Sequence, residues 1–288
     1  MVTAPITAPQ HSTIPYRTNY LKLTMDINLR FPETVSSAEI EQYFKSIGLE
    51  VLIDPSHAPK SLVNEMIQES PYPSELDDLY RLHQFIILNK RTTVLEFGCG
   101  WSTLVMAHAI EDNRKKYWEE VKSLRRNNPF EVSVVDNEKR YLQIAKKRVK
   151  EAGFENVEFL YSRALMTKFN DRLATNYECL PLINPDFIYL DGPDQFNVEG
   201  LINGLSTAHK DFMPMSSDIL LFEHFLTPGT IIVVDGRAAN SRFLRSNLQR
   251  NWTYTYDESG DQHIFQMDEE PLGEYSKKQL EFYSKAPF

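Results

Sequence analysis

The sequence predicts an α/β protein built on a doubly wound, mostly parallel sheet. One observation is a set of five short apolar runs separated by helical patterns, at residues 92–97, 131–136, 157–162, 185–191 and 230–235. Strands that alternate with helices in this way are typical of parallel βαβ units. A second observation is a late pair of β segments, residues 252–257 and 262–267, joined by the turn-rich residues ESGD. That pair predicts a hairpin after the fifth strand.

The chain before this region predicts a small N-terminal extension. Residues 1–20 are rich in Pro, Thr and Ser and carry no apolar period, so we expect a loose arm, and residues 20–31 have the patchy alternation of a strand. Residues 36–54 combine a serine cap and a helical pattern with a short β-like end. Residues 70–90 begin with two prolines and predict a helix capped at Ser74.

These patterns divide the chain into three parts. Residues 1–75 form an arm and an α/β extension, residues 76–267 form the main domain, and residues 268–288 form a polar tail. The tail contains one helical pattern, at residues 275–285.

Composition narrows the class of protein. The chain has 288 residues, of which 42% are hydrophobic, and a net charge of −9, which argues against a general nucleic-acid-binding surface. Its two cysteines, Cys99 and Cys179, lie far apart and fit a reducing compartment. No apolar run approaches the ~18–20 residues of a membrane span, and the N-terminus does not resemble a secretory signal. We therefore expect a cytoplasmic protein, with a homo-oligomer left open because the arm is long enough to reach a neighbouring subunit.

The end of the first predicted strand carries a candidate ligand loop. Glu96 ends the strand, Gly98 and Gly100 follow, and Ser102 and Thr103 open the next helix. Glycines allow positive φ and close approach of a ligand, and the first amides of a helix attract polar groups. A tight strand-to-helix turn in any α/β domain is the alternative interpretation. The fingerprint of a dinucleotide oxidoreductase requires a third glycine where Thr103 stands, which disfavours that class.

Asp136 ends the second predicted strand. A carboxylate at this position accepts two hydrogen bonds from a ribose diol in dinucleotide-binding folds. The alternative is that Asp136 only caps the following helix.

These motifs resemble those of class I S-adenosylmethionine-dependent methyltransferases. VLEFGCGWST and VSVVDNE are similar to the family's first two motifs, and FIYLDGPD and GTIIVVDGR to its fourth and fifth strand ends. The resemblance covers roughly residues 76–267 and implies a seven-stranded sheet of order 3-2-1-4-5-7-6, with strand 7 antiparallel and helices on both faces. It implies S-adenosylmethionine as cofactor, with Glu96, Gly98 and Gly100 along its methionine and ribose side and Asp136 on the ribose hydroxyls.

The chain departs from the family pattern in two places. Ser102 replaces the third glycine of the first motif, and we keep it among the cofactor-binding residues. After the third strand the acidic residue that the family places near adenine is missing, and SRALM stands there instead. Ser162 and Arg163 are therefore the candidates for adenine contacts, through backbone or stacking.

The acceptor side is expected at the ends of the fourth and fifth strands, where Asp191 and Asp235 lie. Two such carboxylates are able to hold Mg²⁺, which would orient and acidify a hydroxyl. Gly236 stands where a further ligand is usual, with Asn240 as a substitute. The alternative is that Asp191 closes the cofactor pocket and Asp235 caps a helix.

Histidine supplies a second kind of candidate base. His209 follows an apparent helix and should lie near the end of the fourth strand, whereas His83, His224 and His263 are interpreted as structural or surface residues. Arg237 is expected either to bind an acidic substrate or to neutralise the two aspartates.

Three hypotheses about function follow. The leading one is a methyltransferase acting on a hydroxyl or amine of a small-molecule or sugar-like acceptor. The second is an aminopropyl-type transferase on the same fold, and the third is an inactive binding or scaffold module. The intact Glu96, Gly98, Gly100 and Asp136 argue against the third.

Overall fold

The computed structural model describes residues 28–54, 74–209 and 211–287. Its centre is a seven-stranded sheet with the order β3-β2-β1-β6-β8-β10-β9. The strands are β1 (Thr93–Phe97), β2 (Glu131–Asp136), β3 (Val157–Tyr161), β6 (Phe187–Leu190), β8 (Ile231–Asp235), β9 (Trp252–Asp257) and β10 (Gln262–Met267). β10 pairs antiparallel with both β8 and β9, and the other pairs are parallel. The predicted strand order and the hairpin are therefore confirmed.

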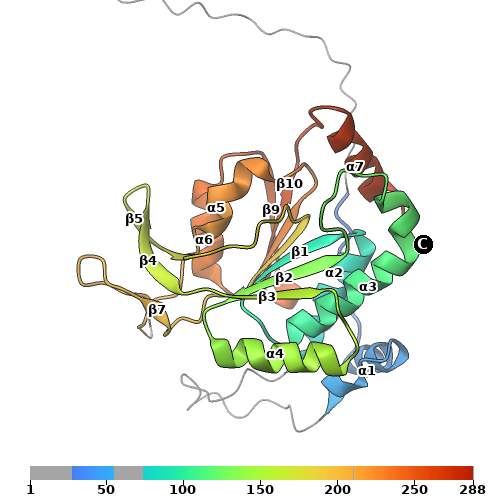
Figure 1. The fold of residues 1–288 in the computed structure, drawn as a ribbon, viewed down its shortest axis with the longest axis horizontal. Coiled ribbons are helices and arrows are strands. Elements are labelled where there is room, and N and C mark those ends of the chain that lie inside the picture. Colours follow the sequence, from blue (N-terminus) through green and yellow to red (C-terminus); the bar gives the residue numbers. More distant parts are fainter. Residues whose placement is uncertain (1–27, 55–73, 210, 288) are drawn as a thin grey trace, which may run out of the picture.

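Helices cover both faces of this sheet (Figure 1). One face carries α1 (Ser37–Ser46), α2 (Leu76–Leu88), α3 (Trp101–Val121), α4 (Lys139–Glu151) and α7 (Glu274–Ser284). The other face carries α5 (Asp218–Phe222) and α6 (Ala238–Asn247). Three short 3-10 helices, η1 (Glu50–Ile53), η4 (Glu223–Phe225) and η5 (Glu258–Gly260), join these elements.

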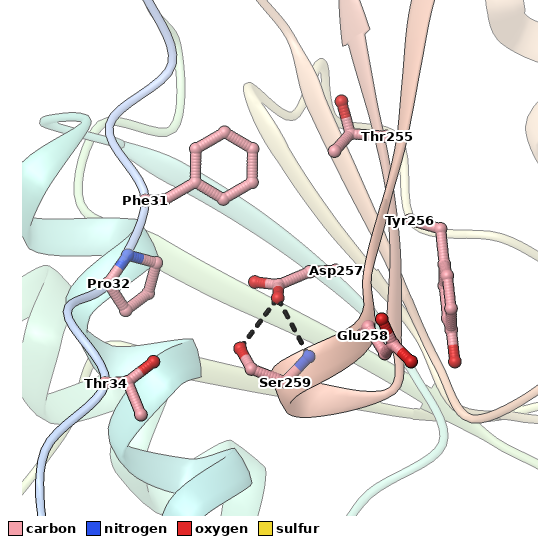
Figure 2. A pocket seen from close by; sticks show the side chains of 8 residues that line it. All are labelled: Phe31, Pro32, Thr34, Thr255, Tyr256, Asp257, Glu258 and Ser259. Atoms are coloured by element: carbon pink, nitrogen blue, oxygen red, sulfur yellow. Dashed lines mark hydrogen bonds between the residues drawn. The ribbon is translucent and has the colours of Figure 1, made fainter.

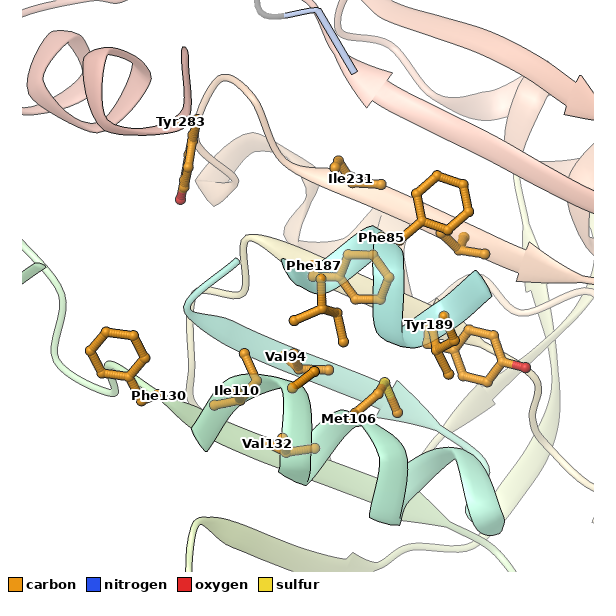
Figure 3. Close-up of a cluster of buried hydrophobic side chains, with 14 of the residues drawn as sticks. Phe85, Val94, Met106, Ile110, Phe130, Val132, Phe187, Tyr189, Ile231 and Tyr283 are labelled. Carbon is orange, nitrogen blue, oxygen red and sulfur yellow. The ribbon is translucent and has the colours of Figure 1, made fainter. Parts of the chain in front are cut away.

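Alternating side chains of the strands feed two cores, because successive residues point to opposite faces. Figure 3 shows the first core, in which Val94, Phe187 and Ile231 pack against Phe85 of α2 and Met106 of α3. The second core holds the strand residues that point to the other face, such as Leu95, Ile188 and Ile232, together with apolar residues of α5 and α6. The parallel strands read as continuous apolar runs because both of their faces are covered.

A second, three-stranded sheet was not predicted. It consists of β4 (Ala164–Phe169), β5 (Arg172–Tyr177) and β7 (Val198–Glu199), in the order β5-β4-β7. β4 and β5 form a hairpin whose two-residue turn, Asn170 and Asp171, has positive φ angles of 48° and 60°. Asn and Asp are among the residues that such a turn favours, so this signal was available in the sequence.

The N-terminal extension differs from the prediction in three details. α1 and its Ser36 cap are confirmed, with a full capping box to Glu39. The predicted β-like end at its C-terminal side is wrong, since η1 lies there. The cap of α2 is Glu75, because the Ser74 hydroxyl donates to the Leu52 carbonyl at 2.8 Å. The predicted arm and most of the predicted strand at residues 20–31 lie outside the described residues, and residues 28–30 form no strand.

The predicted tail helix is confirmed as α7, and it is not a detached appendage. Leu280, Phe282 and Tyr283 are buried in the first core beside residues of α2 and α3. The carboxyl ends of the parallel strands β1, β2, β6 and β8 lie together at one edge of the sheet, which is called the C-terminal edge below. α7 lies near the opposite, N-terminal edge (Figure 1).

Candidate functional site

The two glycines of the loop after β1 have different structural roles. Gly98 has φ +93°, and an added Cβ would lie 3.2 Å from the backbone of Asp191 and of Gly192. Gly98 is therefore required by its conformation and by the close approach of the loop after β6. Gly100 has extended backbone, and an added Cβ would meet only Ser102 Oγ, at 3.8 Å. Its α-carbon faces open space beside the start of α3.

Glu96 is the anchor of this loop. Its carboxylate is fully buried and accepts hydrogen bonds from Ser102 Oγ at 2.5 Å and from Thr103 Oγ1 at 2.6 Å. Burial raises the pKa of Glu96 to about 8, although the two hydroxyls act in the opposite direction. The hydroxyls at the start of α3 thus point inward to Glu96, and the first turn of the helix is fixed against the end of β1.

Asp136 lies one strand away and is also buried. Its Oδ1 accepts from the Glu138 amide at 2.6 Å, and burial raises its pKa to about 7. The neighbouring Asn137 joins this turn to the segment after β6, accepting from the Asp194 amide and donating to the Asn197 carbonyl, both at 3.0 Å. The alternative that Asp136 caps the following helix is wrong, because Glu138 is the N-cap of α4 and Asp136 accepts a hydrogen bond in the turn before it. Its ribose contact stays a prediction.

Ser162 and Arg163 follow β3 and are both engaged within the protein. Arg163 is exposed and forms ion pairs with Glu178 at 2.7 Å and with Glu199 at 3.1 Å. Ser162 Oγ accepts from the Cys179 amide at 2.8 Å. Their predicted adenine contacts stay a prediction.

The structure brings Asp191 and Asp235 to the same edge of the sheet. Arg237 donates from Nε to Asp191 Oδ1 at 3.0 Å and from a terminal nitrogen to the Pro193 carbonyl at 3.2 Å. Tyr189 donates its hydroxyl to Asp235 Oδ2 at 2.7 Å. Burial and the charge of Asp191 raise the pKa of Asp235 to about 6.

Two further acids at this edge were missed by the sequence interpretation. Asp78 in the first turn of α2 has a pKa raised to about 8, by burial and then by the charge of Asp235. The charge of Glu75, the N-cap of α2, contributes to raising the pKa values of Asp78, Asp191 and Asp235. Acids in a first helical turn are ordinary, because the helix dipole favours them, so no sequence pattern distinguishes this role.

The donor set does not favour the predicted Mg²⁺ site. Asp191 is neutralised by Arg237, and Asn240 lies buried with its Oδ1 accepting from the Ser216 amide at 2.8 Å. Asn240 therefore does not substitute for the missing ligand. Within residues 28–54, 74–209 and 211–287, no three His, Cys, Asp or Glu side chains are grouped to hold a metal ion.

The histidines are divided between surface and core. His209 has a side chain that is 57% exposed, and its Nδ1 accepts from the Asp211 amide at 3.1 Å. The helix expected before it is absent from residues 201–209, although Gln195 after β6 does donate to its carbonyl. His83 is fully buried, with Tyr43 2.7 Å from Nδ1 and His108 2.9 Å from Nε2. A catalytic role for His209 stays a prediction.

A shallow hollow of about 630 Å³ lies beyond the end of β9 (Figure 2). It is lined by Phe31, Pro32, Thr34, Thr255, Tyr256, Asp257, Glu258 and Ser259. Asp257 accepts from the Ser259 hydroxyl and amide and forms an ion pair with Arg81 of α2.

No helix among the described residues is long and apolar enough to cross a bilayer.

Comparison with known proteins finds a family model that matches part of the chain. The ubiE/COQ5 methyltransferase family model matches residues 82–179, which include the loop after β1 and the end of β2. No curated protein sequence is similar to the chain. Among solved structures, the O-methyltransferase TomG of Streptomyces achromogenes is 16% identical, with a TM-score of 0.35, over 83% of this chain and 92% of that one. A methyltransferase from Geobacter sulfurreducens is 11% identical, with a TM-score of 0.35, over 82% and 90%.

The seven-stranded order and the match of residues 82–179 to a methyltransferase family model agree with the fold of the class I S-adenosylmethionine-dependent methyltransferases, which the sequence motifs resemble.

Proposed function

We propose that this chain transfers the methyl group of S-adenosylmethionine to a hydroxyl or amine of a small molecule at the C-terminal edge of the sheet. The observation that carries the proposal is the loop after β1, where a Cβ added at Gly100 would meet only Ser102 Oγ, at 3.8 Å, next to the strand β2 that ends at Asp136. In open α/β sheets, ligands bind outside the carboxyl ends of the strands near the change in strand order. β1 lies at that point, between β2 and β6.

The reaction requires positioning more than covalent chemistry, because the cofactor carries the electrophilic carbon. The chain supplies a rigid loop at Gly98, fixed by Glu96, and a candidate ribose partner in Asp136. Asp191 and Asp235 at the neighbouring strand ends are in place to orient an acceptor and to take a proton from it. The net charge of −9 supports a small molecule over a nucleic acid as acceptor.

Calorimetry with S-adenosylmethionine tests the proposal directly. We expect binding by the wild type and a loss of about 1.5–3 kcal/mol, or roughly 10- to 150-fold in affinity, in Asp136→Ala. Glu151→Ala, at the exposed end of α4, is the matched control and should bind as the wild type does. Absence of wild-type binding would overturn the proposed function, and unchanged affinity in Asp136→Ala would leave that residue as a turn-forming side chain only.

Decarboxylated S-adenosylmethionine separates this proposal from an aminopropyl transferase. A methyltransferase should prefer the intact cofactor, because the loop after β1 is the part of the family's site that faces the methionine end. Tighter binding of the decarboxylated form would favour the aminopropyl alternative.

A further inference from the structure

Four carboxylates form one acidic cluster at the C-terminal edge, namely Glu75, Asp78, Asp191 and Asp235. Asp191 and Asp235 lie at the ends of adjacent strands, β6 and β8. Glu75 and Asp78 come from the start of α2, which packs on the same face of the sheet as Tyr189. The Tyr189 hydroxyl is hydrogen-bonded to Asp235, so the cluster lies where α2 meets the strand ends.

The cluster lacks the cations that its charge requires. Arg237 pairs with Asp191 at 3.0 Å. Arg81, one turn along α2, is bound to Asp257 of β9 instead. In the part of the chain that the structure describes, none of the other three acids has an ion pair with a lysine or arginine. Carboxylates placed near one another without counter-charges repel, and an incoming cation relieves that repulsion.

Gln262 gives an independent sign that a ligand completes this region. Its side chain is 0% exposed and lies in register between Asp235 and Asp257 on the neighbouring strands. Paired residues on adjacent strands share a face, so the amide is directed at Asp235, and a hydrogen bond with Gln262 lowers the pKa of that carboxyl. Among the described residues, the buried Oε1 of Gln262 has no hydrogen-bond partner. A buried amide oxygen without a donor is unfavourable, as is expected where a ligand later completes the site.

We propose that the acidic cluster binds a positively charged amine of the acceptor, so that the chain is an N-methyltransferase for a small cationic amine. This inference rests on the proposed function and adds the chemical class of its substrate. An ammonium near a carboxylate gains Coulomb attraction, whereas a neutral hydroxyl gains none. Several unpaired acids therefore discriminate strongly between the two acceptors.

The same acids provide the proton acceptor that an amine needs. A carboxylate, Asp235 or Asp78, takes one proton from the ammonium, which leaves a lone pair on nitrogen. The lone pair forms a bond to the methyl carbon while the carbon–sulfur bond breaks and its electron pair stays on sulfur. The products are the methylated ammonium and S-adenosylhomocysteine, and the proton passes from the carboxyl to water. No further reactant is required.

Binding of n-butylammonium and n-butanol tests this inference, because the two probes match in size and differ in charge. Ligand-observed NMR at pH 7.5 should show at least tenfold tighter binding of the amine, with and without S-adenosylhomocysteine. Asp235→Asn and Asp78→Asn should each reduce that preference at least threefold, and the double variant should abolish it. Glu111→Gln, which removes a partly buried acid of α3 paired with Arg114, should leave the preference unchanged. Far-ultraviolet dichroism establishes that each variant is folded.

The possible outcomes separate this inference from the proposed function. Equal affinity for amine and alcohol, with S-adenosylhomocysteine still bound, would overturn the inference alone. A preference that survives in the double variant would place the amine elsewhere and also overturn it. Displacement of the amine by millimolar Mg²⁺, reversed by a chelator, would assign the acids to a metal and overturn it. An amine preference without any cofactor binding would keep the inference and overturn the proposed function.

Discussion

The two edges of the sheet hold buried charge in opposite ways. At the N-terminal edge, Asp186 accepts from both Thr92 and Thr93, from the Tyr283 hydroxyl at 2.6 Å, and from Arg126 at 2.8 Å. Burial alone would raise the pKa of Asp186, but Arg126 and Arg91 hold it below its ordinary value. This carboxylate is therefore stabilised as an ion by the protein itself.

At the C-terminal edge, Glu75, Asp78 and Asp235 have no ion pair with a lysine or arginine of the described residues. Asp78 and Asp235 have pKa values raised to about 8 and about 6, each by burial and by a neighbouring carboxylate. Asp186 is fully buried, whereas Asp78 and Asp235 are partly buried, so the two edges differ in exposure as well as in the partners of their acids. Charge that the chain pairs internally stabilises the fold, whereas charge that it leaves unpaired at strand ends is available to a ligand.

Asp186→Asn should produce the largest loss of stability. The substitution keeps the shape of the side chain but leaves Arg126 and Arg91 without their buried counter-charge. We expect a loss of about 3–5 kcal/mol in the free energy of unfolding, measured by urea titration. Asp235→Asn is the matched change at the other edge and should alter stability by less than about 1 kcal/mol. Equal losses in both variants would remove the distinction between the two edges.

The two glycines after β1 should respond differently to alanine. Gly98→Ala forces a side chain into a positive φ and against the backbone of Gly192, so we expect a loss of about 1–3 kcal/mol in urea unfolding. Gly100→Ala should change stability by less than about 0.5 kcal/mol, because its backbone is extended and its Cβ meets open space. If the proposed cofactor position is right, Gly100→Ala should nevertheless weaken S-adenosylmethionine binding. A variant that keeps full affinity would place the cofactor away from this loop.

Asp78→Asn should show a smaller effect that depends on pH. The folded-state pKa of Asp78, about 8, is above its ordinary value of 3.8. At pH 9 the folded protein holds an ionised carboxylate at a cost, and below pH 8 it takes up a proton that the unfolded chain does not bind. Stability of the wild type therefore falls as the pH rises from about 4 to 8, so the variant should be more stable than the wild type by at least about 1 kcal/mol at pH 9, by less at pH 6, and by nothing at pH 4 or below. A difference independent of pH would show that Asp78 is not held in an acidic environment.

Much of the fold could be predicted from local sequence patterns. The apolar runs that lead to Glu96, Asp136 and Asp235 predicted the strands. They also predicted that these acids lie at one edge of the sheet, because the carboxyl ends of parallel strands lie together. The hairpin of β4 and β5 was not predicted, although Asn170 and Asp171 carry its turn signal.

The partners of each site residue could not be predicted in the same way. Asp186 accepts a hydrogen bond from Tyr283, which is 97 positions away, and the pKa of Asp78 in α2 is raised by the charge of Asp235 in β8. These relations follow from the packing of α2 and α7 on the sheet, which no local pattern encodes. Arg237 is the exception, because its place directly after β8 already suggested that it neutralises an aspartate.

Amide hydrogen exchange with and without S-adenosylhomocysteine tests most directly the claim that ligands bind at the edge with unsatisfied charge. The account predicts added protection in residues 98–103 and 136–140, at the ends of β1 and β2, and none at Arg91, Asp186 and Tyr283. Protection confined to the N-terminal edge, or no change at either edge at saturating ligand, would contradict it.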